Sequence, residues 1–175
     1  FDFVDDSLKI LDKFSPELVT LSSELENFYK KYLSESDYFL NVSSRIKSPM
    51  SLKEKILRNN YYLMFSDAEG FFFELSDLIG IRLECRFIED EEKLYQAIKR
   101  IFCLQRPDGY YYNDEFPNIL LNLTDKQPQI QKNGFEIYRL DGIIIGESAT
   151  FHYELQLKSL VNMFWGEIEH KILYK

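Results

Sequence analysis

Several residue types that define whole classes of protein are scarce in this chain of 175 residues. It has 2 cysteines, Cys85 and Cys103, too few for a disulfide framework, and both are expected to be buried thiols in a reducing cytoplasm. Because it has only 2 histidines, we do not expect a zinc site of the usual His/Cys type. The low counts of 7 Gly and 5 Pro argue against collagen-like and low-complexity sequence.

Long apolar runs are also missing from the sequence. No run approaches the ~18 residues that a membrane-spanning helix needs, and the first residues do not form a signal-peptide pattern. We therefore expect a cytoplasmic protein that does not bind membranes. The chain starts with Phe1 rather than Met and stops just after a helical pattern, which is typical of a piece of a longer protein.

Acidic side chains outnumber basic ones, 29 to 21, so the formal net charge is −8. This balance disfavours nucleic-acid binding over a broad surface, although one local basic groove remains compatible with it. Hydrophobic residues make up 45% of the chain and aromatic residues 16%, which is enough to form a buried core at this length. The composition therefore predicts one globular domain.

Helical spacing of apolar residues predicts several helices. A short helix is expected over residues 2–13, and a second begins at Ser15, a typical N-cap residue followed by a proline. Ser48 and the proline after it repeat this signal for a helix through about residue 59, and Asp90 is expected to cap another. The last helix is expected to bury an apolar face made of Val161, Phe164, Trp165, Ile168 and Ile172.

Alternation of apolar and polar residues predicts strands over residues 79–87 and 151–158, each with one buried face. Residues 106–133 are expected to be mostly loop, with a short strand at 119–123. The dipeptide Asp141-Gly142 is typical of a two-residue turn and predicts a hairpin between the apolar segments around it. The order of elements predicts an α+β fold with a mixed, largely antiparallel sheet flanked by helices.

The first candidate for chemistry is a pair of carboxylates, Asp77 just before one predicted strand and Glu154 on the polar face of another. Two carboxylates from neighbouring strands can hold Mg²⁺ through oxygen ligands, and one of them can accept a proton from an attacking hydroxyl. In a chain with 29 acidic residues, the same pattern is also typical of a turn residue and a solvated side chain.

The second candidate is a basic cluster in a net acidic chain. Arg45, Lys47, Lys55 and Arg58 lie around the start of one predicted helix, where Ser51, Lys55 and Arg58 share a helix face. Polyphosphate binding needs several cations, and the amides of a helix N-terminus add to them. An ordinary solvated helix face gives a similar pattern.

The third candidate combines aromatic and polar residues, namely Phe135, Tyr138, Arg139, Gln156 and Lys158. Aromatic rings stack on nucleobases, and Arg and Lys bind the phosphates of an acceptor. The alternative is that the rings pack in the core, which is common in a chain this rich in aromatic residues.

Three segments resemble, in order, the motifs of RelA/SpoT synthetase domains, which make the alarmones pppGpp and ppGpp. SRIKSPMSLKEK at residues 44–55 resembles the opening motif, and DLIGIR at 77–82 resembles the aspartate motif. YELQLK at 153–158, followed by MFWGEIEHK at 163–171 and YK at 174–175, is similar to the glutamate motif and closing helix. This last block is the most specific of the three.

The resemblance implies one synthetase-like domain over residues 1–175, with N-terminal helices over 1–40 and a catalytic core of nucleotidyltransferase-like fold over 41–175. It implies Mg²⁺-dependent transfer of pyrophosphate from ATP to the 3′-hydroxyl of GDP or GTP. On this basis Asp77 and Glu154 are the catalytic and metal-binding carboxylates. The implied ATP-binding residues are Arg45, Lys47, Ser51, Lys55 and Arg82, and the implied acceptor-binding residues are Phe135, Tyr138, Arg139, Gln156 and Lys158.

Two departures from the family pattern concern the acceptor. The family's Gly-Tyr-Arg-Ser-x-His stretch corresponds here to NGFEIYR at residues 133–139. In this stretch Glu136 puts negative charge in place of a cation, and Phe135 or Tyr138 is the available stacking ring. The glutamate motif ends in Lys158 rather than arginine, which keeps the charge but loses bidentate phosphate binding.

These departures leave alternatives open. Small synthetases that resemble this chain include toxins that pyrophosphorylate another acceptor, such as the 3′ end of tRNA. A degenerate nucleotide-binding sensor would also lack the usual acceptor residues. The chain has no His-Asp hydrolase domain, so alarmone hydrolysis is not expected. Because small members often assemble through terminal helices, a homo-oligomer is a further expectation.

Overall fold

One β-sheet organises residues 2–173, the part of the chain that this computed structural model describes. The helices are α1 (Asp2–Leu33), α2 (Pro49–Asn59), α3 (Tyr61–Met64), α4 (Ala68–Glu74), α5 (Ile88–Ile101) and α6 (Leu160–Leu173). The strands are β1 (Asn41–Ile46), β2 (Ile79–Cys85), β3 (Leu104–Gln105), β4 (Tyr110–Asn113), β5 (Phe116–Asn122), β6 (Gln129–Ile130), β7 (Glu136–Ile145) and β8 (Thr150–Ser159).

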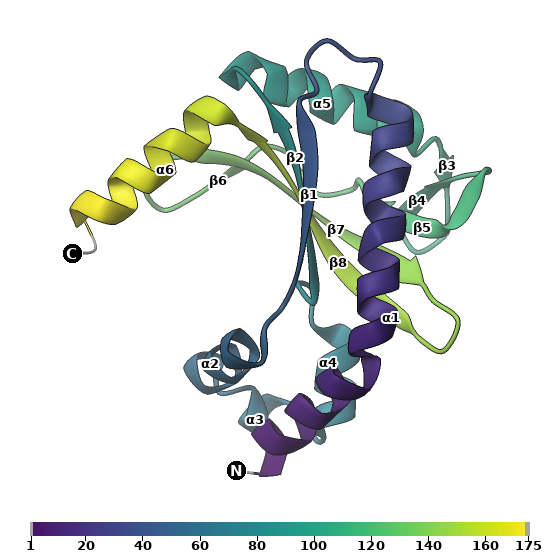
Figure 1. Cartoon of the computed structure of the whole chain (residues 1–175), viewed down its shortest axis with the longest axis vertical. Helices are drawn as coiled ribbons and strands as arrows, with labels where there is room; N and C mark the ends of the chain where they lie inside the picture. The colour runs from purple at the N-terminus through teal and green to yellow at the C-terminus, as the bar shows by residue number, and fades with distance from the viewer. Residues whose placement is uncertain (1, 174–175) are drawn as a thin grey trace.

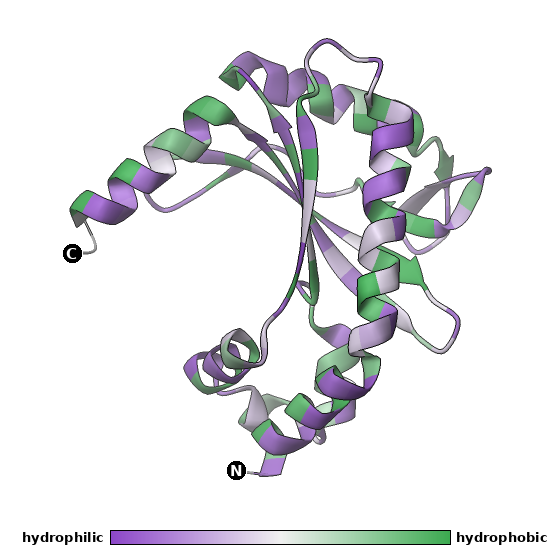
Figure 2. Ribbon diagram, in the orientation of Figure 1, coloured by the Kyte–Doolittle hydropathy of each residue, from purple (hydrophilic) through white to green (hydrophobic). Residues whose placement is uncertain are grey.

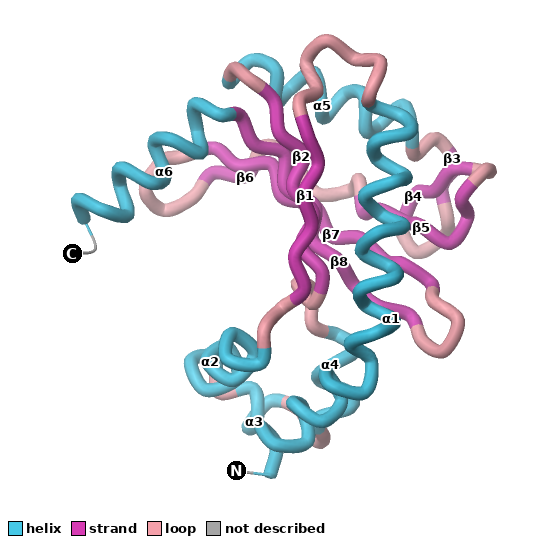
Figure 3. Tube along the Cα trace, in the orientation of Figure 1, coloured by secondary structure: helices cyan, strands magenta, loops and turns pink. Residues whose placement is uncertain are grey.

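The strand order in the sheet is β1-β2-β8-β7-β5-β4-β3, and the short β6 pairs with β7. Strand β2 runs parallel to β8, and the other described pairs are antiparallel. Helices lie on both sides of the strands in Figure 3. The structure therefore confirms the expected α+β fold with a mixed, largely antiparallel sheet flanked by helices.

The two faces of the sheet differ in polarity. In β8 the buried residues Phe151, Tyr153, Leu155 and Leu157 alternate with the half-buried residues His152, Glu154, Gln156 and Lys158. Helices α1, α4 and α5 pack on the apolar face, where α1 runs along the sheet (Figure 1). The polar face has α2 at one end and α6 at the other, and no helix of the described residues covers its centre (Figure 1).

Aromatic side chains join α1 to the sheet and to α4. The ring of Phe14 lies 5.4 Å from that of Phe151 in β8 and 6.2 Å from that of Phe72 in α4, measured between centroids. The hydroxyls of Tyr29 and Tyr153, both fully buried, share a hydrogen bond of 2.8 Å. These contacts fix β8 from the side opposite to Glu154.

The two helices expected over residues 2–13 and from Ser15 onward are a single helix, α1. Pro16 lies inside it, although a proline removes a backbone hydrogen bond and often ends or bends a helix. Packing outweighs this local cost, because α1 has buried residues on both sides of the proline, from Val4 to Leu33. The predicted helix start at Ser15 is therefore wrong, whereas the division of the chain at residue 40 stays a prediction.

The hairpin predicted at Asp141-Gly142 is also wrong. Both residues lie in the middle of β7, a strand of 10 residues that pairs with β8. The turn between these strands lies at residues 146–149 instead, where Gly146 N donates to the carbonyl oxygen of Ala149. Gly142 is required by close packing rather than by a turn, because a Cβ there would lie 2.3 Å from Cε1 and Cζ of Tyr153.

Other local expectations are corrected by the structure. Residues 106–133, expected to be mostly loop, contain β4, β5 and β6, and the strand expected at 119–123 overlaps β5, which begins earlier, at Phe116, and ends at Asn122. Asp90, expected to cap α5 from outside, lies within its first turn, because α5 begins at Ile88. The Asp90 side chain accepts a hydrogen bond of 3.3 Å from the backbone amide of Phe87, the residue before the helix. Cys85 is buried as expected, but Cys103 is exposed.

The last helix does not bury the apolar face expected of it. Phe164, Trp165 and Ile172 have exposed fractions of 61, 52 and 71%. The reason is that α6 leaves the end of β8 and extends away from the sheet, with hydrophobic residues along it (Figure 2). Tyr174 and Lys175 of the closing motif lie outside the described residues, and a homo-oligomer formed through terminal helices stays a prediction. Among residues 2–173 no helix is long and apolar enough to cross a bilayer.

We predict that Gly142→Ala destabilises the fold by ~1–3 kcal/mol, because the added methyl group overpacks the buried Tyr153 ring. Urea unfolding measures this loss. Gly166→Ala is the matched control, since a Cβ at this helical position has no atom within 4 Å and the substitution should be neutral or stabilising. Equal stability of the wild type and Gly142→Ala would contradict the packing argument.

Candidate active site

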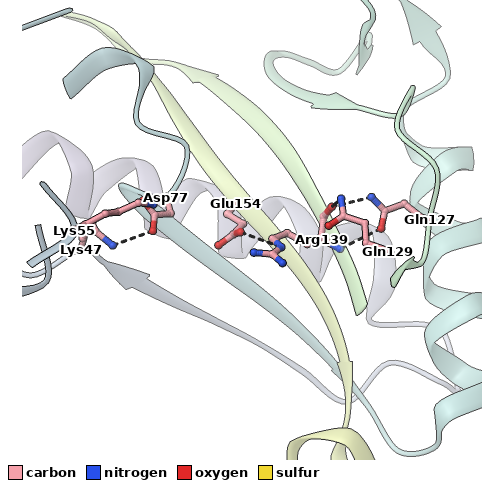
Figure 4. A network of polar contacts seen from close by, with 7 residues as sticks. All are labelled: Lys47, Lys55, Asp77, Gln127, Gln129, Arg139 and Glu154. Carbon is pink, nitrogen blue, oxygen red and sulfur yellow. Dashed lines mark hydrogen bonds and ion pairs between the residues drawn. The ribbon is translucent and has the colours of Figure 1, made fainter. Parts of the chain in front are cut away.

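The polar face of the sheet carries both carboxylates that the sequence singles out. Asp77 lies just before β2, and Gly80 of β2 is the register partner of Glu154 in β8. Partnered residues point to the same face of a sheet, so Glu154 projects beside a residue that has no side chain. The Glu154 carboxylate lies between the Asp77 carboxylate and the Arg139 guanidinium in Figure 4.

Two lysines from different segments hold Asp77. Lys47, just after β1, donates a hydrogen bond of 2.9 Å to Oδ2, and Nζ of Lys55 in α2 lies 3.0 Å from Oδ1. Burial disfavours the ionised form of Asp77, but the two lysines outweigh this effect and lower its pKa. The Lys55 contact is an ion pair without good hydrogen-bond alignment, so Oδ1 is buried with no hydrogen-bond donor among the described residues.

Helix α2 begins where the sequence predicts. Ser48 is its N-cap, and the Ser48 Oγ accepts a hydrogen bond of 3.1 Å from the backbone amide of Ser51. This start sets the direction in which α2 leaves β1, and it brings Lys55 to Asp77. Ser51 and Arg58 are exposed, and the ion pairs of Asp77 do not include Arg58.

Glu154 has a different electrostatic environment. Its Oε1 lies 3.5 Å from Nε of Arg139, and its side chain is 17% exposed. Burial raises the pKa of Glu154; Arg139 opposes this rise, and the negative charges of Asp77 and Asp141 add to it. A carboxylate with a raised pKa is a better proton acceptor than an ordinary surface carboxylate.

Two adjoining pockets open on the polar face, and Gln156 lines both of them. The arginine pocket, of about 200 Å³, is lined by Arg45, Arg82, Glu154 and Gln156 together with neighbouring residues of β1 and β2. The aromatic pocket, of about 180 Å³, is lined by Phe135, Arg139, Gln156 and Lys158 together with residues of α6. Ligands in the two pockets would therefore meet beside Glu154.

Tyr138 is placed differently from the other predicted acceptor residues. Its side chain is on the apolar face of β7, only 7% exposed, and its ring packs 5.5 Å from that of Tyr95. Its hydroxyl donates a hydrogen bond of 2.6 Å to Glu92. Phe135 is 40% exposed, so it offers the ring with an accessible face in the aromatic pocket.

The sequence did not reveal three polar residues of this face. Asp141, which sequence analysis assigned to a turn, is the register partner of Glu154 in β7. The side-chain amides of Gln127 and Gln129 donate to the carbonyl oxygen of Arg139 at 2.8 and 3.1 Å and fix the position of this residue (Figure 4). Only the alternation along β7 could have indicated Asp141, and no local signal marks the two glutamines.

A metal ion in this site would need ligands from the substrate. The described residues contain no group of three or more His, Cys, Asp and Glu side chains that could hold a metal ion. Mg²⁺ commonly takes one or two carboxylates and completes its coordination with phosphate oxygens and water. Asp77 and Glu154 fit this pattern, and the buried Oδ1 of Asp77 has a lone pair for such an ion once Lys55 turns away.

Comparison with known proteins defines the class to which the chain belongs. Residues 44–175 match the family described as the region found in RelA / SpoT proteins. This match spans most of the chain, so the chain belongs to the RelA/SpoT family, and the resemblance seen in its three motifs is confirmed.

The similar proteins share the fold at low sequence identity. The GTP pyrophosphokinase YwaC of Bacillus subtilis (strain 168) is 21% identical over 192 residues, covering 98% of this chain and 80% of that protein. A GTP pyrophosphokinase family protein from Streptococcus pneumoniae has a TM-score of 0.61 at 19% identity, covering 95% of this chain and 75% of its own. The small alarmone synthetase 1 from Bacillus subtilis bound to its product pppGpp has a TM-score of 0.57 at 22% identity, covering 95% of this chain and 80% of its own.

We predict that Asp77→Asn lowers the free energy of unfolding at pH 7 by ~1–3 kcal/mol, because two lysines lose their counter-ion. The folded state lowers the pKa of Asp77 below its ordinary value of 3.8, so the stabilisation is present above that value and is lost as the pH falls through the folded pKa. Urea unfolding of both proteins between pH 7 and pH 3 should show their difference shrinking in acid. A difference that stays constant would contradict this assignment.

Proposed function

We propose that this protein is an alarmone synthetase that transfers a pyrophosphoryl group from ATP to the 3′-hydroxyl of GDP or GTP. The observation that carries this proposal is the meeting of a cationic pocket and an aromatic pocket beside Glu154, in a chain of the RelA/SpoT family. The names of its relatives support it, since small alarmone synthetase 1 from Bacillus subtilis has been solved with pppGpp and with AMPCPP.

The arginine pocket and the start of α2 suit the phosphates of ATP. Arg45 and Arg82 line this pocket, and Lys47 and Lys55 lie beside it on Asp77. When ATP binds, its phosphates offer the two ammonium groups a competing partner, which frees the Asp77 oxygens. Phosphoryl-type transfer needs mainly charge neutralisation and in-line positioning, and four cations provide the first. The Ser51 hydroxyl at the start of α2 would add a hydrogen bond to a phosphate oxygen.

Asp77 and Glu154 are the residues that would hold Mg²⁺, which supplies further charge neutralisation at the transferred phosphates. The two carboxylates differ in electrostatic character, because Asp77 has a lowered pKa and Glu154 a raised one. Asp77 therefore remains ionised and suits a permanent ligand. Glu154 suits a group that also accepts a proton.

The aromatic pocket suits the acceptor nucleoside. The exposed ring of Phe135 can stack on a base; Gln156 and Lys158 line the same pocket, and Gln156 also lines the arginine pocket. Glu154 takes the proton of the acceptor 3′-hydroxyl as the oxygen of that hydroxyl bonds to the β-phosphorus of ATP. The bond from that phosphorus to the oxygen bridging to the α-phosphate breaks, and AMP leaves.

The first test is transfer of label from γ-labelled ATP, in the presence of Mg²⁺, to GDP, GTP, adenine nucleotides or tRNA offered separately. We expect transfer to GDP and GTP, and a loss of at least ~10²-fold in Glu154→Gln, since general-base catalysis contributes about that much. Glu35→Gln, on the exposed turn after α1, is the control and should keep full activity.

Three outcomes would contradict the proposal in different ways. Label on tRNA alone would identify the alternative acceptor, and binding of ATP without any transfer would identify a nucleotide sensor. Full activity of Glu154→Gln, with an unchanged melting temperature, would remove Glu154 as the base and as a required ligand.

A second prediction concerns the stacking ring. Phe135→Ala should raise the KM for the acceptor by ~10-fold, because a base–aromatic stack contributes ~1–3 kcal/mol, and should leave the KM for ATP unchanged. Phe87→Ala, a change at a ring that is 55% exposed and lies outside both pockets, is the control. An increase confined to the KM for ATP would place Phe135 in the donor site instead.

A further inference from the structure

Two lysines lie against the carboxylate that is proposed to bind the metal. Lys47 donates a hydrogen bond of 2.9 Å to Oδ2 of Asp77, and Nζ of Lys55 lies 3.0 Å from Oδ1 (Figure 4). The side chains of Lys47, Lys55 and Asp77 are 12, 18 and 21% exposed, so water separates these charges little. Each oxygen of Asp77 thus faces an ammonium group at contact distance.

The two lysines are attached to Asp77 in different ways. The backbone amide of Lys47 donates a hydrogen bond of 2.8 Å to the carbonyl oxygen of Leu78, the residue after Asp77, and its ammonium group is aligned with Oδ2. Lys55 reaches Asp77 from α2, and its contact is an ion pair without that alignment. Oδ1 is therefore buried with no hydrogen-bond donor among the described residues. This oxygen has a lone pair left for another ligand, and Lys55 is the group in its way.

A bare metal ion and a polyphosphate have opposite effects on Lys55. The ammonium group repels a divalent cation that approaches Oδ1, and the second carboxylate, Glu154, already faces Arg139 at 3.5 Å. A polyphosphate carries several negative charges and attracts the same ammonium group away from Asp77. Oδ1 then becomes accessible at the moment when the phosphates bring negative charge to the site.

We propose that Lys55 is a gate of the metal site: its ammonium group keeps a divalent cation off Asp77 until a polyphosphate draws it away, so that metal and nucleotide bind together. This inference rests on the proposed function and adds the order of events at the site. A phosphate oxygen replaces Asp77 as the partner of Lys55, and the metal replaces Lys55 as the partner of Asp77. Every charged group keeps a counter-ion, which matters because an unpaired charge is costly in a largely buried site.

One test measures binding of Mn²⁺, a probe for Mg²⁺, by electron paramagnetic resonance with no nucleotide present. Lys55→Met keeps a long side chain but loses the ammonium group. It should bind Mn²⁺ at least ~10-fold more tightly than the wild type, because a positive charge in contact with the ligand oxygen is gone. Lys53→Met is the matched control, since Lys53 is exposed on the same helix and the described ion pairs of Asp77 do not include it. Its affinity for Mn²⁺ should equal that of the wild type.

A double variant shows whether the gained Mn²⁺ binds at Asp77. Lys55→Met combined with Asp77→Asn should return to the wild-type affinity, because the carboxylate is removed as well. A gain that persists in the double variant, an equal gain in Lys53→Met, or a wild type that binds Mn²⁺ as tightly as Lys55→Met would overturn the inference. These measurements need no turnover. If label transfer fails but Lys55→Met gains affinity, the proposed function is lost and the gate stands.

A second readout follows the nucleotide by calorimetry in the presence of a chelator. Asp77→Asn should bind metal-free α,β-methylene-ATP ~5-fold more tightly than the wild type, because its lysines no longer leave an ion pair to reach the phosphates. Glu154→Gln controls for repulsion alone, since it removes a carboxylate of the same face whose ion pair is with Arg139 rather than a lysine, and its gain should be smaller. A gain in Glu154→Gln as large as that in Asp77→Asn, or no gain in Asp77→Asn, would overturn the inference.

Discussion

The parallel pairing of β2 with β8 is the constraint on which the site depends. These strands lie far apart in the sequence, and their register sets Gly80 beside Glu154 and Arg82 beside Gln156. A slip by one residue would turn Glu154 into the core and place Leu155 on the polar face. The register is held from the apolar side, because Tyr153 packs against Gly142 and shares a buried hydrogen bond with Tyr29. The position of the Glu154 carboxylate thus follows from how its neighbour in sequence, Tyr153, is packed.

The same face gives two carboxylates opposite electrostatic character. Asp77 meets two lysines and has a lowered pKa, whereas Glu154 meets one arginine and two other carboxylates and has a raised pKa. Groups of one chemical type whose pKa values are pushed apart can divide the work of charge binding and proton transfer. Asp141, the register partner of Glu154 in β7, contributes to the difference between the two pKa values because its negative charge raises the pKa of Glu154. It belongs to the site because β7 continues where the Asp-Gly dipeptide predicts a turn.

The sequence predicted best those parts of the molecule whose signal is local. Alternation identified β2 and β8, Ser48 identified the start of α2, and the motifs identified the family. Features decided by distant contacts were missed. Helix α1 continues through Pro16 because it packs on both sides of the proline, and Gly142 leaves room for the Tyr153 ring rather than forming a turn. The residues assigned to the site stay predictions, but the geometry separates them. Phe135 faces a pocket, and Tyr138 lies in the core with its hydroxyl on Glu92.

The two halves of the site are built differently, and this bears on how the acceptor is chosen. The arginine pocket, which we propose for ATP, lies over β1 and β2, and the ion pairs of Asp77 with Lys47 and Lys55 tie these strands to α2. The aromatic pocket, which we propose for the acceptor, is closed by the turn before β7 and by α6, a helix that extends from the sheet and is anchored at its start by the buried Glu91. Further along α6, Glu169 accepts a hydrogen bond of 3.3 Å from Asn133 in the turn before β7. Under the proposed function, substitutions in this wall can therefore change which acceptor fits while the cations of the arginine pocket stay in place.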